Sequence, residues 1–307
     1  MSQTGEIIIF NRYSDTDEVE KVYGDKAVKF AYDSFLGKMM GPIISSRLVS
    51  QLYGKMQDRD SSRDKVPPFV NKFQIKMDEY QAGSVPAERK ENSYKNFNEF
   101  FIRKFNEGER TFPLEKKLMG ACAEARYYAV EKVDNDVKYP VKGKYIKAKD
   151  LLGNTKYSEC FEDGPFMIAR LCPVDYHRYH YLDNGVTLEH NLIAGDFHSV
   201  NPLALKLRNN ILIKNERRVS ILETDNFGKI AYIEVGATCV GKIVQTHDET
   251  TPFNRGEEKG YFLFGGSTVI ILGEKGKWRP SDDLLKNTAL GRETYVKLGD
   301  TIATSTM

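Results

Sequence analysis

The chain has 307 residues, of which 40% are apolar and 29% are charged, a composition that is ordinary for a globular protein. Its 45 Lys and Arg residues nearly balance its 43 Asp and Glu residues, so the net charge is only +2. Nucleic-acid-binding proteins usually carry a concentrated basic excess, and we therefore expect no nucleic-acid partner.

The sequence predicts neither a signal peptide nor a transmembrane helix. The apolar run Ile7–Phe10 is short and follows no basic cluster, and no stretch approaches the ~20 apolar residues that a spanning helix needs. The four cysteines, Cys122, Cys160, Cys172 and Cys239, are widely spaced and form no CxxC pair. Free thiols in a reducing compartment are expected, in a protein that is soluble or lies on a membrane surface.

The first third of the chain is predicted to be helical. Asp15 or Asp17 is expected to cap a first helix, Gly41-Pro42 to open another, and a further amphipathic helix is expected over Asn96–Phe105, with its phenylalanines on one side. The basic, apolar-rich segment Phe30–Met56 has two interpretations. It is either a surface that contacts a membrane or a set of core helices that cover the rest of the protein.

Beyond about Met119 the pattern changes to short Val-, Ile- and Tyr-rich runs separated by turn residues, which predicts strands. The expected strands are Val130–Val133, Phe166–Leu171, Val219–Leu222, Ile230–Val235 and Thr268–Leu272. The predicted fold class is therefore α+β, with a helical region over residues 1–110 packed on a β-rich, largely antiparallel domain over residues 111–307.

Two segments carry residues suited to chemistry. In Phe264-Gly265-Gly266-Ser267-Thr268 two glycines precede a serine, and such a turn brings a hydroxyl close to its own preceding carbonyl, although a plain glycine turn before a strand has the same pattern. The segment Arg170-Leu-Cys-Pro-Val-Asp-Tyr-His-Arg-Tyr-His180 holds His177 and His180 beside Asp175. Histidine is the usual general acid or base, and a structural role or a metal site are the alternatives for this segment alone.

Together these two segments resemble the processing site and the histidine motif of the phosphatidylserine decarboxylase family. The similarity spans roughly residues 90 to 302 and includes further stretches in the same order. These are Phe97–Lys104, Val141–Gly143, Ser199–Pro202, Val235–Gly241 and Gly256–Phe262.

The resemblance implies a self-processing enzyme. Ser267 attacks the Gly266 carbonyl, the chain is cleaved between these residues, and Ser267 becomes a pyruvoyl group. That group forms a Schiff base with the substrate amine and replaces pyridoxal phosphate, so neither pyridoxal phosphate nor a metal is expected. Gly265 and Thr268 support the processing site. The two cleaved chains are expected to stay associated through the strand Thr268–Leu272, and a homodimer is implied.

The resemblance also implies roles for the histidines. His180 activates Ser267, and His177 serves decarboxylation as a proton donor. Asp175 is the acid nearest in sequence, whereas the family takes its acid from an Asp-Gly segment whose place is held here by Glu124 and Ala125. The longer glutamate side chain leaves three interpretations open: an adjusted loop, slow processing, or an unprocessed relative.

The substrate that the resemblance implies is phosphatidylserine, which is converted to phosphatidylethanolamine and CO2 on the cytoplasmic side of a membrane by a peripheral protein. Two alternatives stay open. One is a pyruvoyl-dependent decarboxylase of a free, for example aromatic, amino acid, and the other is a processing-dead relative that keeps the fold.

Overall fold

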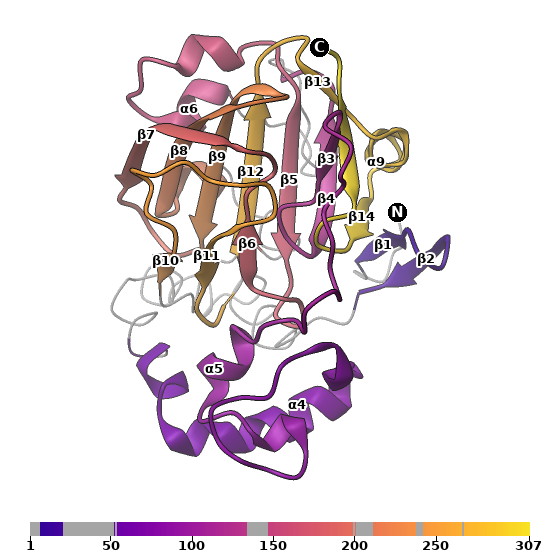
Figure 1. Cartoon of the computed structure of the whole chain (residues 1–307), viewed down its shortest axis with the longest axis vertical. Coiled ribbons are helices and arrows are strands. Elements are labelled where there is room, and N and C mark those ends of the chain that lie inside the picture. Colours follow the sequence, from indigo (N-terminus) through magenta and orange to yellow (C-terminus); the bar gives the residue numbers. More distant parts are fainter. Residues whose placement is uncertain are drawn as a thin grey trace, which may run out of the picture.

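The computed structural model describes residues 7–20, 52, 54–133, 147–198, 200, 211–237, 242–265 and 267–307. A nine-stranded sheet forms the centre of this part of the chain (Figure 1). In spatial order its strands are β2 (Thr16–Val19), β1 (Ile8–Asn11), β14 (Glu293–Val296), β4 (Ala125–Val130), β5 (Phe166–Leu171), β12 (Ser267–Gly273), β9 (Gly228–Gly236), β8 (Arg217–Thr224) and β7 (Gly185–Ile193). Only the β1–β14 pair is parallel, and every other pair in this sheet is antiparallel.

Two small sheets accompany the large one. The first consists of β10 (Ile243–Gln245), β11 (Glu258–Phe262) and β6 (Arg178–His180), and the second of β13 (Trp278–Pro280), β15 (Thr301–Ser305) and β3 (Leu118–Gly120). Both are antiparallel. The expected α+β class with a largely antiparallel β region is confirmed.

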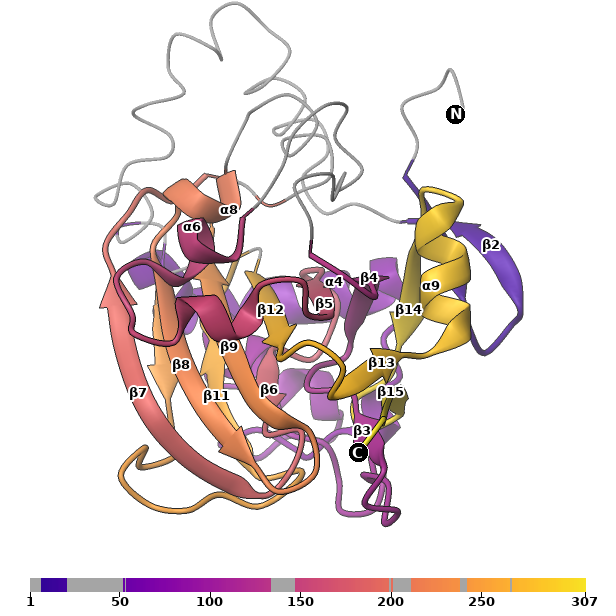
Figure 2. The same cartoon turned by 90° about the horizontal axis from the view of Figure 1, so that it is seen from above.

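The helices are short and lie around the edges of the sheet. Helices α4 (Val66–Phe73) and α5 (Phe97–Phe101) lie together at one end of it (Figure 1). Figure 2 shows α9 (Asp282–Ala289) beside β14 and β4, and α6 (Ala148–Leu152) next to α8 (Ile211–Lys214). The 3-10 helices are η1 (Asp60–Lys65), η2 (Met77–Glu79), η3 (Lys90–Asn92) and η4 (Ser158–Phe161).

The N-terminal segment departs from the sequence prediction. The prediction that Asp15 or Asp17 caps a helix is wrong. Thr16–Val19 is strand β2, and Asp15, with a φ of 54°, lies in the turn of the hairpin that β2 forms with β1. The run Ile8–Asn11 pairs in parallel with β14. A partner almost three hundred residues away decides this conformation, and a local pattern cannot reveal that partner.

Helix α5 is shorter than predicted. Asn96 caps it by accepting a hydrogen bond from the Glu99 amide, as N-cap asparagines do. The helix ends at Phe101, so Phe105 packs in a separate cluster with Tyr80 and Tyr176. The remaining phenylalanines of α5 pack with α4 and with Phe264, which ties the helices at this end to the segment that precedes Ser267.

Most of the segment Phe30–Met56 lies outside the described residues, so its two interpretations stay predictions. The same holds for the division of the chain near residue 110. Of the predicted strands, Phe166–Leu171 coincides with β5, and the predicted strands ending at Leu222, Val235 and Leu272 lie within β8, β9 and β12.

Candidate active site

Ser267 is the first residue of β12, a strand in the interior of the large sheet. It lies opposite Leu171 of β5 and Gly236 of β9, and it is fully buried. The run that follows Ser267 is apolar, and every residue from Ser267 to Gly273 is buried. Such a run is typical of a strand that has neighbours on both sides. Gly265 adopts a φ of 149°, a conformation that side-chain-bearing residues rarely take, and Gly266 lies outside the described residues.

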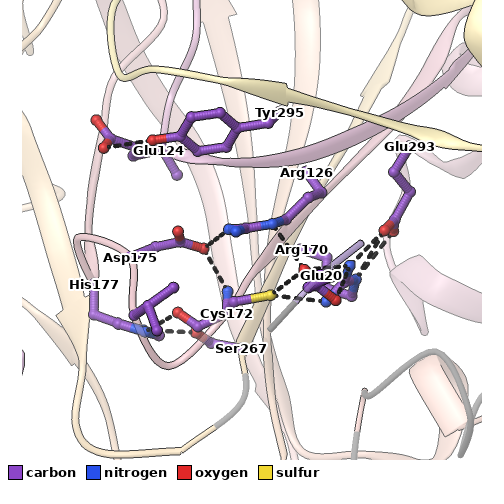
Figure 3. Close-up of polar contacts among 12 residues, drawn as sticks. Glu20, Glu124, Arg126, Arg170, Cys172, Asp175, His177, Ser267, Glu293 and Tyr295 are labelled. Atoms are coloured by element: carbon purple, nitrogen blue, oxygen red, sulfur yellow. Dashed lines mark hydrogen bonds and ion pairs between the residues drawn. The ribbon is translucent and has the colours of Figure 1, made fainter. Parts of the chain in front are cut away.

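His177 is the histidine that contacts Ser267. Its Nδ1 lies 3.1 Å from the serine Oγ, and its Nε2 lies 2.9 Å from the Cys172 carbonyl oxygen. A carbonyl oxygen only accepts hydrogen bonds, so Nε2 must carry the proton of the neutral ring. Nδ1 therefore presents its lone pair to the serine hydroxyl (Figure 3).

The surroundings of His177 keep its ring neutral. The side chain is fully buried, and burial lowers the pKa of His177 to about 3. The Phe101 ring stacks on the imidazole with a centroid separation of 3.8 Å and an interplanar angle of 22°. At neutral pH the ring is thus an acceptor with a fixed orientation.

His180 occupies a different environment on β6. Its Nδ1 donates to the Gly256 carbonyl at 2.9 Å, which leaves Nε2 to accept from the Tyr176 hydroxyl at 3.3 Å. Burial lowers the pKa of His180 as well. The structure therefore brings His177, and not His180, into hydrogen-bond contact with Ser267.

The two acidic candidates, Glu124 and Asp175, have different hydrogen-bond partners. Glu124 accepts hydrogen bonds from Arg110, at 2.8 Å from its Nε, and from the Tyr295 hydroxyl at 2.9 Å. Among the interactions of the described residues, neither His177 nor His180 is its partner. Asp175 accepts from the backbone amide of Cys172 at 2.6 Å and pairs with Arg126. Asp175 thus braces the turn whose carbonyl orients His177.

Comparison with known proteins shows which family this chain resembles in sequence. The sequence model of the family described as phosphatidylserine decarboxylase matches residues 97–304. A protein of Clostridium tetani named phosphatidylserine decarboxylase proenzyme is 39% identical over 296 residues, which cover 96% of this chain and 97% of the relative. The chain belongs to the phosphatidylserine decarboxylase family.

Two further relatives carry the same name. The protein of Clostridium beijerinckii is 36% identical over 302 residues, covering 98% of this chain and all of the relative. The protein of Desulfitobacterium hafniense is 37% identical over 295 residues, covering 95% and 96%. Family membership confirms the resemblance that the processing-site and histidine motifs indicated.

Sequence reasoning missed the residues that orient His177. Phe101 was assigned only to a helix face, and the acceptor of the Nε2 proton is a backbone carbonyl, which no side-chain motif reveals. Arg126 and Glu20 were not singled out, although both belong to the buried network around Asp175. A charged residue inside an otherwise apolar strand, such as Arg126 in β4, is the sequence signal that could have pointed to this network.

The described residues contain no helix long and apolar enough to cross a membrane. They contain no group of three or more His, Cys, Asp or Glu side chains arranged to hold a metal ion either.

The burial of His177 predicts a pH-dependent stability. Its pKa is 6.5 in the unfolded chain and about 3 in the folded one, so between these values only the unfolded chain binds the proton. The free energy of unfolding should therefore fall as the pH is lowered through 6.5, by about 1.4 kcal/mol per pH unit from this one group.

Urea unfolding of Ser267→Ala, with and without His177→Gln, measures this contribution between pH 6.5 and pH 4. Both proteins share every other titrating group, so the difference in their slopes belongs to His177. Equal slopes would show that the ring is not held neutral in the fold.

Proposed function

We propose that this protein is a proenzyme that cleaves itself between Gly266 and Ser267 and then, with the resulting pyruvoyl group, decarboxylates phosphatidylserine. The proposal rests mainly on one observation: Nδ1 of a buried, neutral His177 faces the Ser267 hydroxyl at 3.1 Å. In a member of this family, that pair is suited to activating the serine against its own backbone.

Self-processing begins at the Ser267 hydroxyl. As Ser267 Oγ attacks the Gly266 carbonyl carbon, its proton passes to His177 Nδ1. The Gly266–Ser267 C–N bond breaks, the serine nitrogen takes up a proton, and an ester replaces the peptide bond. Loss of the serine Cα proton then releases the Gly266 carboxylate, and hydrolysis of the remaining dehydroalanine yields ammonia and the pyruvoyl group.

The roles of the two histidines differ from those that the family resemblance implied. We assign activation of Ser267 to His177, because His177 is its hydrogen-bond partner. The Cys172 carbonyl takes the position that a carboxylate holds in a Ser-His-Asp triad. His180, bound to Gly256 and Tyr176, supports the histidine segment. Glu124 bonds to Tyr295, whose ring centroid lies 5.0 Å from the Arg126 guanidinium that pairs with Asp175, so its support is indirect.

The pyruvoyl group, once formed, supplies a carbonyl that accepts electrons as CO2 leaves. The residues present fit such a group, since the reacting serine is buried, preceded by glycine and faced by a ring that exchanges protons. His177 stays beside the same position after cleavage. It is therefore also our candidate for returning a proton to the substrate Cα.

The cleaved chains are expected to remain together. Residues 267–307 include β12, which pairs with β5 on one side and β9 on the other, and β14, which pairs with β1 and β4. Work at a membrane surface by a peripheral protein, and a homodimer, complete the proposal. Work at a membrane surface follows from the lipid that the relatives' name contains, and the homodimer is an expectation from the family resemblance.

Intact mass spectrometry tests self-processing directly. The wild-type protein should give two chains, residues 1–266 and residues 267–307, with a pyruvoyl group at the start of the second. Ser267→Ala should give one full-length chain. A wild-type protein that stays full-length under conditions where it is folded would contradict the proposal and favour the processing-dead relative.

The substrate is tested on the processed protein. Release of CO2 is expected with vesicles that contain phosphatidylserine and not with free serine or free aromatic amino acids. The reverse result would move the assignment to a free-amino-acid decarboxylase.

A further inference from the structure

The N-terminal hairpin delivers one buried carboxylate to the neighbourhood of the active site. Glu20 directly follows β2, and its amide donates to the Ile7 carbonyl at 2.9 Å, which closes the hairpin. Strand β1 of this hairpin pairs in parallel with β14 at the edge of the large sheet. The Glu20 side chain is only 3% exposed, in contrast to the exposed residues of β2.

Glu20 lies between two arginines that require it. Arg126 on β4 and Arg170 on β5 are directly opposite each other, and both are buried. Like charges at opposed positions of a sheet repel each other, and a buried charge is costly unless it is paired. Glu20 lies 2.8 Å from Arg126 Nε, and both of its oxygens lie 3.1 Å from Arg170 Nη2.

The electrostatics keep Glu20 ionised. Burial raises the pKa of its carboxyl, but the charges of Arg170 and Arg126 outweigh burial and bring that pKa down to about 2. Glu293 of β14 also forms an ion pair with Arg170, with 2.5 Å between Glu293 Oε2 and Arg170 Nη2. Arg126, in contrast, has only Glu20 and Asp175 as ion-pair partners in the described part of the chain.

From this charge cluster, contacts lead to His177 in two ways (Figure 3). Glu20 accepts a hydrogen bond from the Cys172 thiol at 2.7 Å. Glu20 also holds Arg126, Arg126 holds Asp175, and Asp175 accepts from the Cys172 amide at 2.6 Å. Both series of contacts end at Cys172, whose carbonyl oxygen accepts the hydrogen bond from His177 Nε2.

We propose that Glu20 is a positioning residue for self-processing: it anchors Cys172 and thereby selects the His177 tautomer whose Nδ1 accepts the proton of Ser267. This inference rests on the proposed function, in which His177 activates Ser267. It gives Glu20 an indirect part in processing through Arg126, Arg170 and Cys172, whereas the exposed side chains of β2 have none.

Within the described part of the chain, loss of the Glu20 charge leaves Arg126 and Arg170 with Glu293 and Asp175 as their only ion-pair partners. Arg126 and Arg170 then compete for these carboxylates, and Asp175 and Cys172 shift with them. Once the Cys172 carbonyl leaves Nε2, the tautomer with a proton on Nδ1 becomes accessible. In that tautomer Nδ1 donates to Ser267 Oγ and cannot take up its proton. Misplacement of this kind costs about 100-fold in rate.

The test compares Glu20→Gln and Glu20→Asp with Glu18→Gln. Glu18 lies in the same hairpin, but it is exposed, and among the described residues its side chain bonds only to Asn11 and Ser14, so its substitution is a matched loss of charge. Processing of newly synthesised full-length protein is followed by intact mass over time. We expect Glu20→Gln to be about 100-fold slower than wild type, Glu20→Asp to lie between them because it keeps the charge, and Glu18→Gln to match wild type.

A second readout separates positioning from a general loss of structure. In the uncleaved Ser267→Ala protein with 15N-labelled histidine, NMR reports which ring nitrogen of His177 is protonated, and His177→Gln assigns its signals. Ser267→Ala should show His177 protonated at Nε2. Adding Glu20→Gln should introduce the Nδ1-protonated form, and Glu20→Asp should restore the Nε2 form at least in part.

Each outcome decides the inference. Wild-type processing of Glu20→Gln, or slow processing with an unchanged tautomer, would overturn it. If Glu20→Gln does not fold, Glu20→Asp decides, because its shorter side chain cannot span Arg126, Arg170 and Cys172 at once; processing within twofold of wild type would refute the role. Failure of the proposed function is distinct, since it would appear as normal processing of His177→Gln.

Discussion

Replacing His177 with glutamine is expected to slow self-processing by about 10²–10⁴-fold, the usual contribution of a general base. Glutamine retains an Nε2–H group for the Cys172 carbonyl, but at the position of Nδ1 it has no basic nitrogen for the Ser267 proton. The fold should therefore survive while proton transfer from Ser267 is lost. The measurement is the rate at which full-length protein disappears in a time course of intact mass spectra.

His180→Gln is the matched control for this experiment. His180 is three residues away and is also largely buried, but its ring nitrogens contact Gly256 and Tyr176. Its substitution should slow processing less than tenfold if its role is support. A larger effect of His180→Gln than of His177→Gln would return the activating role to His180, as the family resemblance implied.

The largest expected loss of stability comes from Lys259→Met. Lys259 is fully buried on β11, and its Nζ lies 2.8 Å from Glu234 Oε1 on β9 and 2.9 Å from Gln245 Oε1 on β10. Methionine fills a similar volume but leaves the fully buried Glu234 without its counter-charge. Removing one partner of a buried ion pair typically costs about 3–5 kcal/mol. We expect that loss in the free energy of unfolding, measured in urea at pH 8 on the single-chain Ser267→Ala background.

The pH dependence of this loss checks its cause. Burial already raises the pKa of Glu234, and removal of Lys259 raises it further. The folded chain then binds a proton that the unfolded chain releases, so the loss should shrink as the pH is lowered from 8 to 5. Lys229→Met is the control, because its pairs with Glu223 and Glu274 are partly exposed and 3.7 Å long. It should change stability by less than about 1 kcal/mol. A pH-independent loss for Lys259→Met would attribute the effect to packing and not to charge.

Short-range patterns were sufficient for several parts of this protein. The strand over Phe166–Leu171 was predicted at its observed bounds, because a bounded run of large apolar residues is typical of a buried strand. The glycine–serine turn and the histidine segment indicated the family, and Ser267 and His177 do meet in the structure. The kind of chemistry was therefore predicted from the family resemblance that these motifs carry, and not from the residue types alone.

Prediction failed where a partner distant in sequence decides the local conformation. Thr16–Val19 follows Asp15 and contains Asp17, either of which would suit a helix start. It is nevertheless a strand, because it pairs with β1, which in turn pairs with β14 at the other end of the chain. Helix α5 ends at Phe101, and that phenylalanine then stacks on His177, a contact that spans 76 residues.

Pattern and motifs were enough to predict the α+β class, an interior strand over Thr268–Leu272, and the family. The packed fold was needed to show which histidine faces Ser267, which atom accepts the hydrogen bond of its Nε2, and which carboxylate contacts the Cys172 amide. The reason is physical: sequence spacing constrains how far apart two side chains can lie, whereas the protonation site of an imidazole depends on the hydrogen bonds at both of its nitrogens. For His177 those bonds come from β12 and from the Cys172 carbonyl, and contacts from the N-terminal hairpin hold Cys172 in place.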